Sequence, residues 1–582
     1  MAEGGAAYAA KPKEKPFSES VPPITDDPST QLRAQREAAI IKLANNLKEQ
    51  GTPKIATLDG ALMQLAKSHV LISDGNKTWK AEEYLGDGIF YCGKRSRLFG
   101  LKKSKVMVNI ENITSINGEQ IGSSTFAPPK KEEQKPPQYA FYDCVIVGSE
   151  PEAIVAAVAA ARKGLKVLLI SPSERLGGVW TEGGLNQLDI TNSQIRHERS
   201  QKKGVVSDLY SRMGVDFKNR ECGFDTTKAE KQFEALIASE SNITLWKNAK
   251  IDDVLRRENG GRISVNGIVV TYAGRKETVN CSALIDGTGS AELVARVGKE
   301  GTHYTVGRSS ITGKDETMAI TPILQISNLN WSRVEKSAEA GADPRSAAGF
   351  ESLAKEFAKN SKTLKKYKAT VIFNGMNLGR NDDGTVNING VRICGLDSTK
   401  KGDRERAQQI GQEVLKEFVK FLNSSKLASR EGFGKAKYCG VVGLYVRETR
   451  HIMGEDTLTY KDVENGRVSK GSIATGSYPL DIVSYNAGVG AYQEYEKMGY
   501  DGVSNFIGKE THYGLTPGMS KPKGIDNLYV VGEPISVDPI AYGSTRVKPT
   551  GVHYAEALID YISPSIVSQR KEPPKVASEE TE

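Results

Sequence analysis

Three basic side chains are candidates for chemistry. Arg447 and His451 lie four residues apart in VRETRHIMGE, and Arg546 follows in AYGSTRVKP. A guanidinium binds carboxylates and other anions, and an imidazole moves a proton near neutral pH. A structural interpretation stands beside this one, because Glu448 and Glu455 are near enough in the sequence to form ion pairs with these cations. The sequence leaves both interpretations open.

A turn in VIVGSEPEAIVAAVAAARKGLKVLLIS is a second candidate site. An apolar, β-branched run ends before Gly148, and the alanine-rich stretch that follows has Pro151 near its start and Gly164 after its end. We expect strand, tight turn, helix and strand, a βαβ unit whose helix N-terminus suits a phosphate. Gly148, Glu150 and Ala153 match the GxGxxG pattern imperfectly. This segment alone therefore leaves a dinucleotide site and an ordinary βαβ unit as alternatives.

Further motifs follow in order along the chain. They are SERLGG, TEGGL, the strand end IDGTGS, the segment VRETRHIMGE, and the C-terminal KPKGIDNLYVVGEPISVDPIAYGSTRVKP. Together with the turn they resemble the FAD-dependent oxidoreductase family of the glutathione-reductase-like flavoprotein superfamily, over about residues 139–562. The resemblance implies an α/β fold: a Rossmann-like FAD-binding domain with an inserted substrate domain.

The resemblance also implies where FAD would lie. The diphosphate would face the turn at Gly148, and Arg546 would either stabilise charge on the reduced flavin or tie down its loop. Arg447 or His451 would lie near the ring. The implied cofactor residues are Gly148, Ser149, Glu150, Pro151, Ala153, Ser171, Arg175, Gly177, Gly178, Val254, Gly287, Gly289, Gly532, Glu533 and Gly543.

Several positions depart from the family pattern. Glu150 replaces the second glycine, and Ser171 stands where a carboxylate would bond the ribose hydroxyls. Glu533 stands where arginine is common, and Glu152 adds another negative charge at the helix start. Like charges a few ångströms apart repel by about 1 kcal/mol in water and about 4 kcal/mol near a protein surface. We therefore expect Glu150 to point away from the diphosphate or to pair with a cation, and Arg175 is the candidate.

Composition excludes several classes of function. The 582 residues are 38% hydrophobic, and the net charge of +8 does not by itself demand nucleic acid. For the basic cluster Gly93–Lys105, a solvent-exposed face is a simpler interpretation than contact with nucleic acid or another protein. Six cysteines without a CxxC pair and six scattered histidines give no metal or disulfide pattern. No apolar stretch approaches the roughly 18 residues of a membrane span. We expect a cytoplasmic protein without metal, membrane or nucleic-acid partner.

Changes in amino-acid composition and residue pattern along the chain predict its domain organisation. The parts outside the large domain are a disordered arm at 1–30, a small α+β or β module at 31–126 that begins with an amphipathic helix, a Pro-rich linker at 127–138 and a disordered tail at 563–582. The large domain, 139–562, has FAD parts at about 139–190, 241–300 and 510–562, and a substrate part at about 191–240 and 301–509.

Two functions fit this pattern. The first is an FAD-dependent oxidoreductase that takes a hydride from an alcohol or amine, in a small molecule or a modified polymer. Asn186 and Asp189 would face this substrate. The alternative is a non-catalytic structural or interaction protein that reuses a flavoprotein fold, such as a component of a virion or other large assembly. Glu150 and Ser171 motivate the alternative, as does the N-terminal arm and module, which would bind a protein partner.

Overall fold

Contacts divide the chain of the computed structural model into two units, Met1–Lys135 and Pro136–Glu582. The structure describes residues 39–46, 58–67, 71–73, 78–86, 89–93, 105–109, 115–116, 119–120, 140–200, 204–488, 490–506 and 508–569. The expected arm at 1–30 and the linker at 127–138 lie outside the described residues. The same is true of 570–582 in the expected tail.

The first unit contains a six-stranded antiparallel sheet in the order β4-β3-β2-β1-β5-β6. Helix α2 (Leu58–Lys67) contacts β2 and buries Leu62 and Leu65. Residues 39–46 are also helical, within the amphipathic helix expected from the sequence. The strands are β1 (Leu71–Ser73), β2 (Thr78–Gly86), β3 (Ile89–Gly93), β4 (Lys105–Asn109), β5 (Ser115–Ile116) and β6 (Glu119–Gln120).

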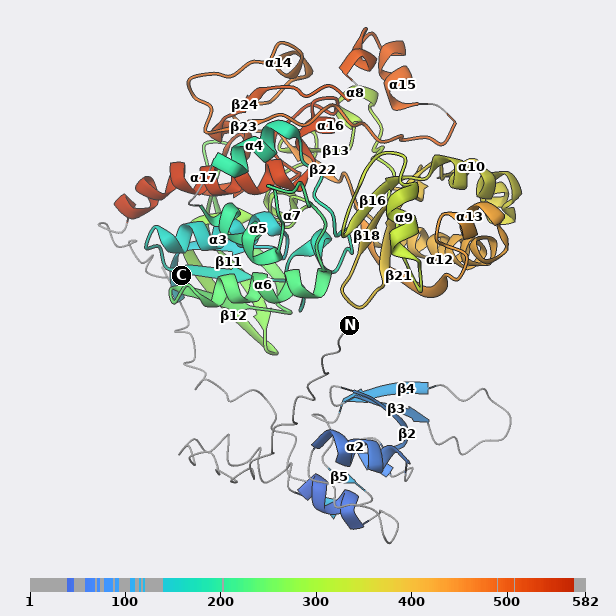
Figure 1. The fold of residues 1–582 in the computed structure, drawn as a ribbon. Helices are drawn as coiled ribbons and strands as arrows, with labels where there is room; N and C mark the ends of the chain where they lie inside the picture. Colours follow the sequence, from blue (N-terminus) through green and yellow to red (C-terminus); the bar gives the residue numbers. More distant parts are fainter. Residues whose placement is uncertain are drawn as a thin grey trace, which may run out of the picture. The chain divides into compact units, whose positions relative to one another are not determined.

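The second unit is built on the predicted βαβ unit (Figure 1). Strand β7 (Ala140–Val147) leads through the turn at 148–150 into α3 (Pro151–Arg162), and β8 (Val167–Ile170) pairs in parallel with β7. Strand β9 (Ile243–Trp246) continues the parallel sheet beyond β8, and β12 (Arg275–Asp286) pairs with the other edge of β7. The predicted α/β class with a Rossmann-like parallel sheet is confirmed.

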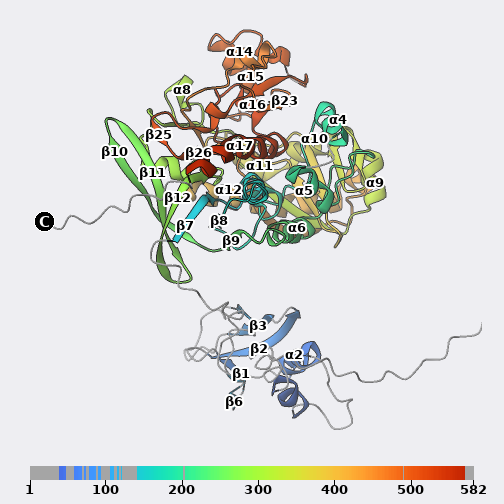
Figure 2. The ribbon, with the colours of Figure 1, turned by 90° about the vertical axis from the view of Figure 1, so that its left-hand side faces the viewer.

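Two antiparallel strands and two late strands complete this sheet, whose edge is visible in Figure 2. Strands β10 (Lys250–Asn259) and β11 (Arg262–Tyr272) form a hairpin beside β12. Strand β25 (Ile525–Asp526) pairs with β11, and β26 (Leu528–Val530) pairs in parallel with β12. The loop after β26 therefore leaves the sheet at the same end as the loops after β7 and β12.

Helix α3 carries small side chains, so other helices can pack closely against it beside the parallel sheet. Eleven of its twelve residues are buried, most of them alanine or valine, and this lets α17 (Lys548–Gln569) pack closely against it (Figure 1). Helices α5 (Val205–Met213) and α6 (Thr226–Ala238) also contact α3. The sequence assigned 191–240 to the substrate part, whereas the structure packs these two helices beside the parallel sheet.

Helix α17 also extends into the tail that was expected to be disordered after Ile562. It continues through Pro564 to Gln569. A proline inside a helix costs about 3 kcal/mol or more. Ile562 and Ile566 are nevertheless buried in the core, and burial of one such side chain contributes roughly 1.5–3 kcal/mol. Packing on both sides of Pro564 therefore offsets its cost, and the expectation of disorder is wrong for 563–569.

A second, antiparallel sheet forms the other half of this unit, in the order β15-β16-β18-β19-β14-β21. Helix α12 (Lys401–Ser424) packs against β14 and β21 and buries Val414, Leu415 and Phe418. The strands are β14 (Thr321–Ser327), β15 (Ala342–Asp343), β16 (Ser346–Gly349), β18 (Met376–Arg380), β19 (Val386–Asn389) and β21 (Lys437–Tyr445).

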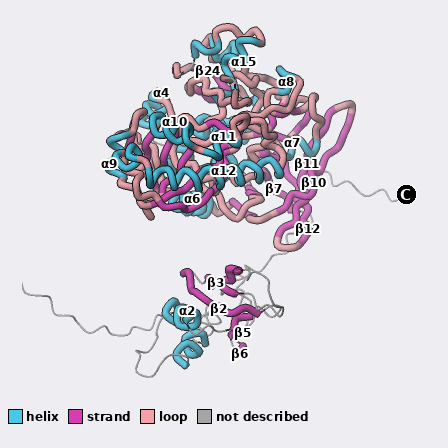
Figure 3. The backbone as a smooth tube through the Cα atoms, turned by 90° about the vertical axis from the view of Figure 1, so that its right-hand side faces the viewer, coloured by secondary structure: helices cyan, strands magenta, loops and turns pink. Residues whose placement is uncertain are grey.

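Short elements and long loops connect the two sheets, and loops make up much of the region around β24, α8 and α15 (Figure 3). The short elements are η2 (Gly178–Trp180), α4 (Asn192–Ser200), α7 (Glu292–Val297), β13 (Tyr304–Val306), α8 (Ser309–Thr312), α9 (Trp331–Ser337), α10 (Glu351–Asn360), α11 (Lys362–Lys366), β17 (Val371–Ile372), β20 (Arg392–Ile393), α13 (Lys426–Arg430), β22 (Arg450–Ile452), α14 (Tyr460–Glu464), β23 (Ala474–Gly476), α15 (Ala491–Lys497), η3 (Val503–Phe506), β24 (Tyr513–Leu515), η4 (Pro517–Ser520) and α16 (Tyr542–Thr545). Within the described part of the chain, no helix is both long and apolar enough to span a membrane.

Candidate functional site

The glycine turn after β7 is held by contact with the loop after β12. Gly148 has φ of +146°, and a Cβ there would lie 2.0 Å from the carbonyl oxygen of Gly287. The amide of Gly287 in turn donates to the carbonyl of Val147 at 2.8 Å. Gly148 is therefore required by the close approach of two strand ends, whether or not a ligand lies above them.

Around this turn lies a group of four charged side chains, Glu150, Glu152, Glu533 and Lys548, which we call the Lys548 cluster. The Lys548 ammonium lies 2.6 Å from a carboxylate oxygen of Glu533, 2.9 Å from one of Glu150 and 3.1 Å from one of Glu152. The Lys548 side chain is 5% exposed and that of Glu152 is 1% exposed. These charges come from three distant segments, so the tertiary fold alone brings them together.

Burial shifts the protonation equilibria of this cluster. It raises the pKa of Glu152 to about 8, although Lys548 partly opposes the shift. It raises the pKa of Glu533 as well, again against the effect of Lys548. Burial alone would lower the pKa of Lys548, but the three carboxylates outweigh it and hold that pKa well above its ordinary value. Lys548 is thus a fixed positive charge, and Glu152 holds its proton at neutral pH.

The residues at this turn do not fit a dinucleotide. Glu150 accepts a hydrogen bond from the amide of Val179 at 3.3 Å and pairs with Lys548, so it does not turn away from the helix N-terminus. Ser171 is buried and donates to the carbonyl of Ser173 at 2.6 Å, so the position expected to bond a ribose carries no carboxylate. A diphosphate placed here would meet the acidic side chains of Glu150, Glu152 and Glu533 and a single lysine.

The prediction that Arg175 pairs with Glu150 is wrong. Arg175 pairs with Glu230 at 2.6 Å, on the helix layer. Lys548 is the partner instead, and sequence reasoning missed it. The sequence did contain a signal: a lysine at the start of a largely apolar helix needs a buried counter-charge, and Glu150 and Glu533 were the unexplained acids.

Two of the three basic candidates, Arg447 and Arg546, lie elsewhere, in a cavity of about 440 Å³ that we call the arginine cavity. It lies beside the antiparallel sheet, where β18, β19 and β21 approach the loop at 478–483 and the end of α16. Its polar lining includes Asp189, Asn377, Asn389, Arg392, Tyr445, Arg447, Tyr478, Asp481 and Arg546. The structure thus brings Arg447 and Arg546 together, with Asp189 beside them as expected for a residue facing a substrate.

Arg447 is a buried cation with neutral partners. Its guanidinium donates to the carbonyl of Ala319 at 3.0 Å, to Thr321 Oγ1 at 2.7 Å and to Asn389 Oδ1 at 3.3 Å. Among the described residues, no Asp or Glu forms an ion pair with it. Its carbon Cζ lies 4.3 Å from the centre of the Tyr445 ring. Burial lowers the pKa of Arg447 to about 10, so it stays charged at neutral pH.

The two other arginines of the cavity differ in their partners. Arg546 pairs with Asp481 and donates to the Tyr445 hydroxyl at 2.8 Å. Arg392 donates to Asn374 Oδ1 at 3.0 Å, and burial lowers its pKa. Of these two arginines, only Arg546 forms an ion pair with a carboxylate among the described residues. Four cations (Lys355, Arg392, Arg447 and Arg546) and three acids (Asp189, Glu351 and Asp481) line the cavity, which therefore has one more cation than acid.

His451 and Asn186 do not line this cavity. His451 Nε2 lies 2.9 Å from Glu448 Oε1, both side chains are buried, and the ring lies edge-on to Tyr542 at 4.4 Å. This contact between His451 and Glu448 agrees with the structural interpretation that the sequence left open. Asn186 donates to Asn381 at 3.2 Å within the protein interior.

Several other implied cofactor residues meet protein atoms. Val254 is buried in β10 opposite Ile268, and a Cβ at Gly177 would lie 2.5 Å from the ring of Phe233. A Cβ at Gly543 would lie 2.7 Å from Ile482, and one at Gly287 would lie 2.6 Å from Ala153. Internal packing therefore accounts for these positions.

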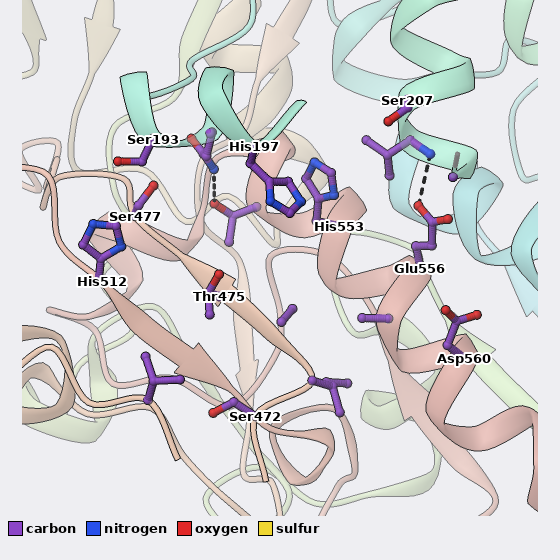
Figure 4. Close-up of a pocket in the computed structure, with 18 residues that line it drawn as sticks. Ser193, His197, Ser207, Ser472, Thr475, Ser477, His512, His553, Glu556 and Asp560 are labelled. Carbon is purple, nitrogen blue, oxygen red and sulfur yellow. Dashed lines mark hydrogen bonds between the residues drawn. The ribbon is translucent and has the colours of Figure 1, made fainter. Parts of the chain in front are cut away.

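A larger cavity of about 650 Å³ lies between α4, α5, β23 and α17 (Figure 4). Several of its polar side chains are already engaged in contacts within the protein. Glu556 accepts from the amides of Val205 and Val206 at 2.7 and 3.1 Å, and His553 pairs with Glu198. No set of three or more His, Cys, Asp or Glu side chains in the described ranges is placed to hold a metal ion. The arginine cavity, with its unbalanced cations, is therefore the better candidate site.

A parallel βαβ sheet joined to an antiparallel sheet over a polar cavity is the fold of the flavoprotein oxidoreductases. The chain belongs to the FAD dependent oxidoreductase family, whose sequence model matches residues 143–559. The resemblance found in the sequence is thereby confirmed.

Solved structures also match at low identity. A geranylgeranyl bacteriochlorophyll reductase-like protein from Thermoplasma acidophilum is 13% identical, with 74% of this chain and 79% of that chain covered and a TM-score of 0.37. A myxobacterial chondrochloren halogenase is 12% identical, with 74% and 76% covered and a TM-score of 0.38. A p-nitrophenol 4-monooxygenase from Pseudomonas putida is 7% identical, with 74% and 80% covered and a TM-score of 0.35. No curated protein matches the chain.

Proposed function

We propose that this chain binds a small molecule carrying one or more carboxylates in the arginine cavity, and that it does so without flavin chemistry. The observation that supports this most directly is Arg447, a buried guanidinium held by neutral oxygen atoms. A buried charge without a counter-ion costs several kcal/mol, and an anionic ligand would supply the missing charge. Arginine is suited to the task because its planar fork binds carboxylates in a bidentate manner.

The rest of the lining agrees with a small, partly apolar ligand. A cavity of about 440 Å³ lies in the range typical of small-molecule sites. Met376, Val483 and the rings of Tyr445 and Tyr478 provide apolar surface beside the arginines. Burial raises the pKa of Asp189, although Arg546 and Arg447 partly oppose the shift.

Oxidation of an alcohol or amine by FAD, the first function expected from the sequence, stays a prediction. When bound, FAD supplies a hydride acceptor. Because the Lys548 cluster does not fit the diphosphate, we derive no step through flavin. The proposal shares the absence of redox chemistry with the second expected function, a non-catalytic structural or interaction protein that reuses a flavoprotein fold, and that function also stays a prediction. Binding of a protein partner by the N-terminal arm and module is likewise a prediction.

Calorimetric titration with succinate, citrate and benzoate tests the ligand proposal. We expect at least one of these carboxylates to bind, and Arg447→Met to weaken that binding by at least about tenfold, which corresponds to about 1.4 kcal/mol. The exposed Arg256→Met is the matched control, because it removes the same charge outside the cavity and should leave the affinity unchanged.

The neutral amides of the same acids should not bind. The proposal would be contradicted if amides and acids bound equally, or if Arg447→Met and Arg256→Met behaved alike. Arg447→Lys separates charge from geometry: it keeps the positive charge but loses the bidentate fork, so an intermediate affinity is expected.

A further inference from the structure

The glycines near the βαβ turn show what the space above it holds. A Cβ at Gly178, where φ is +46°, would lie 2.3 Å from the carboxyl carbon of Glu150. A Cβ at Gly551 would lie 2.5 Å from Glu152 Oε1, and one at Gly532 would lie 3.5 Å from the Glu152 carboxyl carbon. Glycine at 178 and 551 thus makes room for the chain's own acidic side chains, whereas the contact at Gly532 is of ordinary van der Waals length and its φ of +90° is what favours glycine. Gly178 and Gly532 are positions that the resemblance assigned to the cofactor.

The N-terminus of α3 already has an anion beside it. Glu150 is the N-cap residue, and its carboxylate accepts from the Val179 amide of η2 across the turn. Glu152 lies in the first turn of the same helix. The positive end of a helix dipole attracts a negative charge, and in a dinucleotide site the diphosphate supplies it. Here the carboxylate of Glu150, with the side chain of Glu152 beside it, lies in that place instead.

Lys548 neutralises part of this negative charge from the opposite side. It begins α17, the helix that packs on α3, and is nearly fully buried among the three carboxylates. The arrangement is closed: the lysine donors point to protein oxygens at 2.6–3.1 Å. A diphosphate would have to displace these carboxylates from Lys548 and leave them buried without a partner.

We propose that the Lys548 cluster takes the place of a cofactor diphosphate, so that Glu150 and Glu533 exclude FAD from a fold that otherwise keeps the family architecture. The inference is independent of the arginine cavity, because its evidence lies at the ends of β7, β26 and α3 and at the start of α17. Three of the departures from the family pattern, Glu150, Glu152 and Glu533, thereby belong to one cluster around Lys548, whereas Ser171 lies outside it.

The test is to restore the residues that the family pattern leads one to expect. We expect the wild-type chain to show no saturable quenching of FAD fluorescence, and the double variant Glu150→Gly/Glu533→Arg to gain saturable binding with an affinity at least tenfold above any wild-type signal. The matched control is Glu258→Gly/Glu405→Arg, which makes the same change of charge at exposed positions and should gain nothing. Circular dichroism of all three proteins establishes that each is folded.

Glu150→Gln serves if the double variant fails to fold, because it removes one charge and keeps the shape of the side chain. It should bind FAD more tightly than the wild type does. Tight FAD binding by the wild type would overturn the proposal, and so would a fall in affinity for Glu150→Gln. Equal gains in the double variant and its exposed control would show a general effect of charge and would also overturn it.

Discussion

Replacing Lys548 by methionine is expected to lower the free energy of unfolding by about 3–5 kcal/mol, the usual cost of removing one partner from a buried ion pair. Methionine has nearly the length of lysine, so the change removes the charge with little loss of packing. Glu150 and Glu533 would then lie close together without the cation that holds them. Guanidinium-induced unfolding of both proteins measures the difference.

Lys163→Met is the control for this measurement. Lys163 also forms an ion pair, with Asp560 at 2.8 Å, but both side chains are about half exposed. Exposed pairs contribute about 0–1 kcal/mol, so this variant should unfold almost as the wild type does. Adding Glu150→Gln and Glu533→Gln to Lys548→Met should restore part of the lost stability. Equal effects of the two lysine substitutions would show that the buried Lys548 cluster contributes no more to the free energy of unfolding than an exposed ion pair does.

Stability should fall as the pH rises from about 4.5 to about 8, because of Glu152. The pKa of Glu152 is raised from 4.5 to about 8 in the folded protein. Between these values the folded state holds a proton that the unfolded state has lost, so each rise in pH favours unfolding. The loss amounts to at most about 1.4 kcal/mol per pH unit and levels off above the folded pKa.

Glu152→Gln isolates this contribution, because it fixes the side chain in a neutral form of the same shape. Unfolding curves of wild type and variant across this pH range should converge in slope above about pH 8 and diverge below it. The other titrating groups are common to both proteins and cancel in the difference. Parallel curves over the whole range would mean that Glu152 is ionised in the folded state at neutral pH.

The local parts of the fold could be predicted from the sequence. The βαβ unit depends on residues that are neighbours in the sequence: an apolar β-branched run, a glycine turn and an alanine-rich helix with Pro151 at its start. Elements β7, α3 and β8 follow that pattern. The extent of α17 could not be predicted in this way. Pro564 signals a break, and only the burial of Ile562 and Ile566 against distant elements outweighs that signal.

Individual residues of the candidate sites could be predicted from the sequence, but their grouping in space could not. Arg447 and Arg546 were selected individually, and the structure places both in one cavity. The partner of Glu150 was missed because Lys548 is far away in the sequence, while Arg175 is near in the sequence but faces Glu230. Ion pairs between segments depend on the packing of α17 against α3, which no local pattern specifies.

The most direct test of the central claim is the absorption spectrum of the purified full-length chain after incubation with excess FAD and removal of the free cofactor. The account predicts a colourless protein with no flavin band, and no flavin released on denaturation. Flavin recovered at about one molecule per chain would contradict it, because the diphosphate would then have displaced the carboxylates from Lys548.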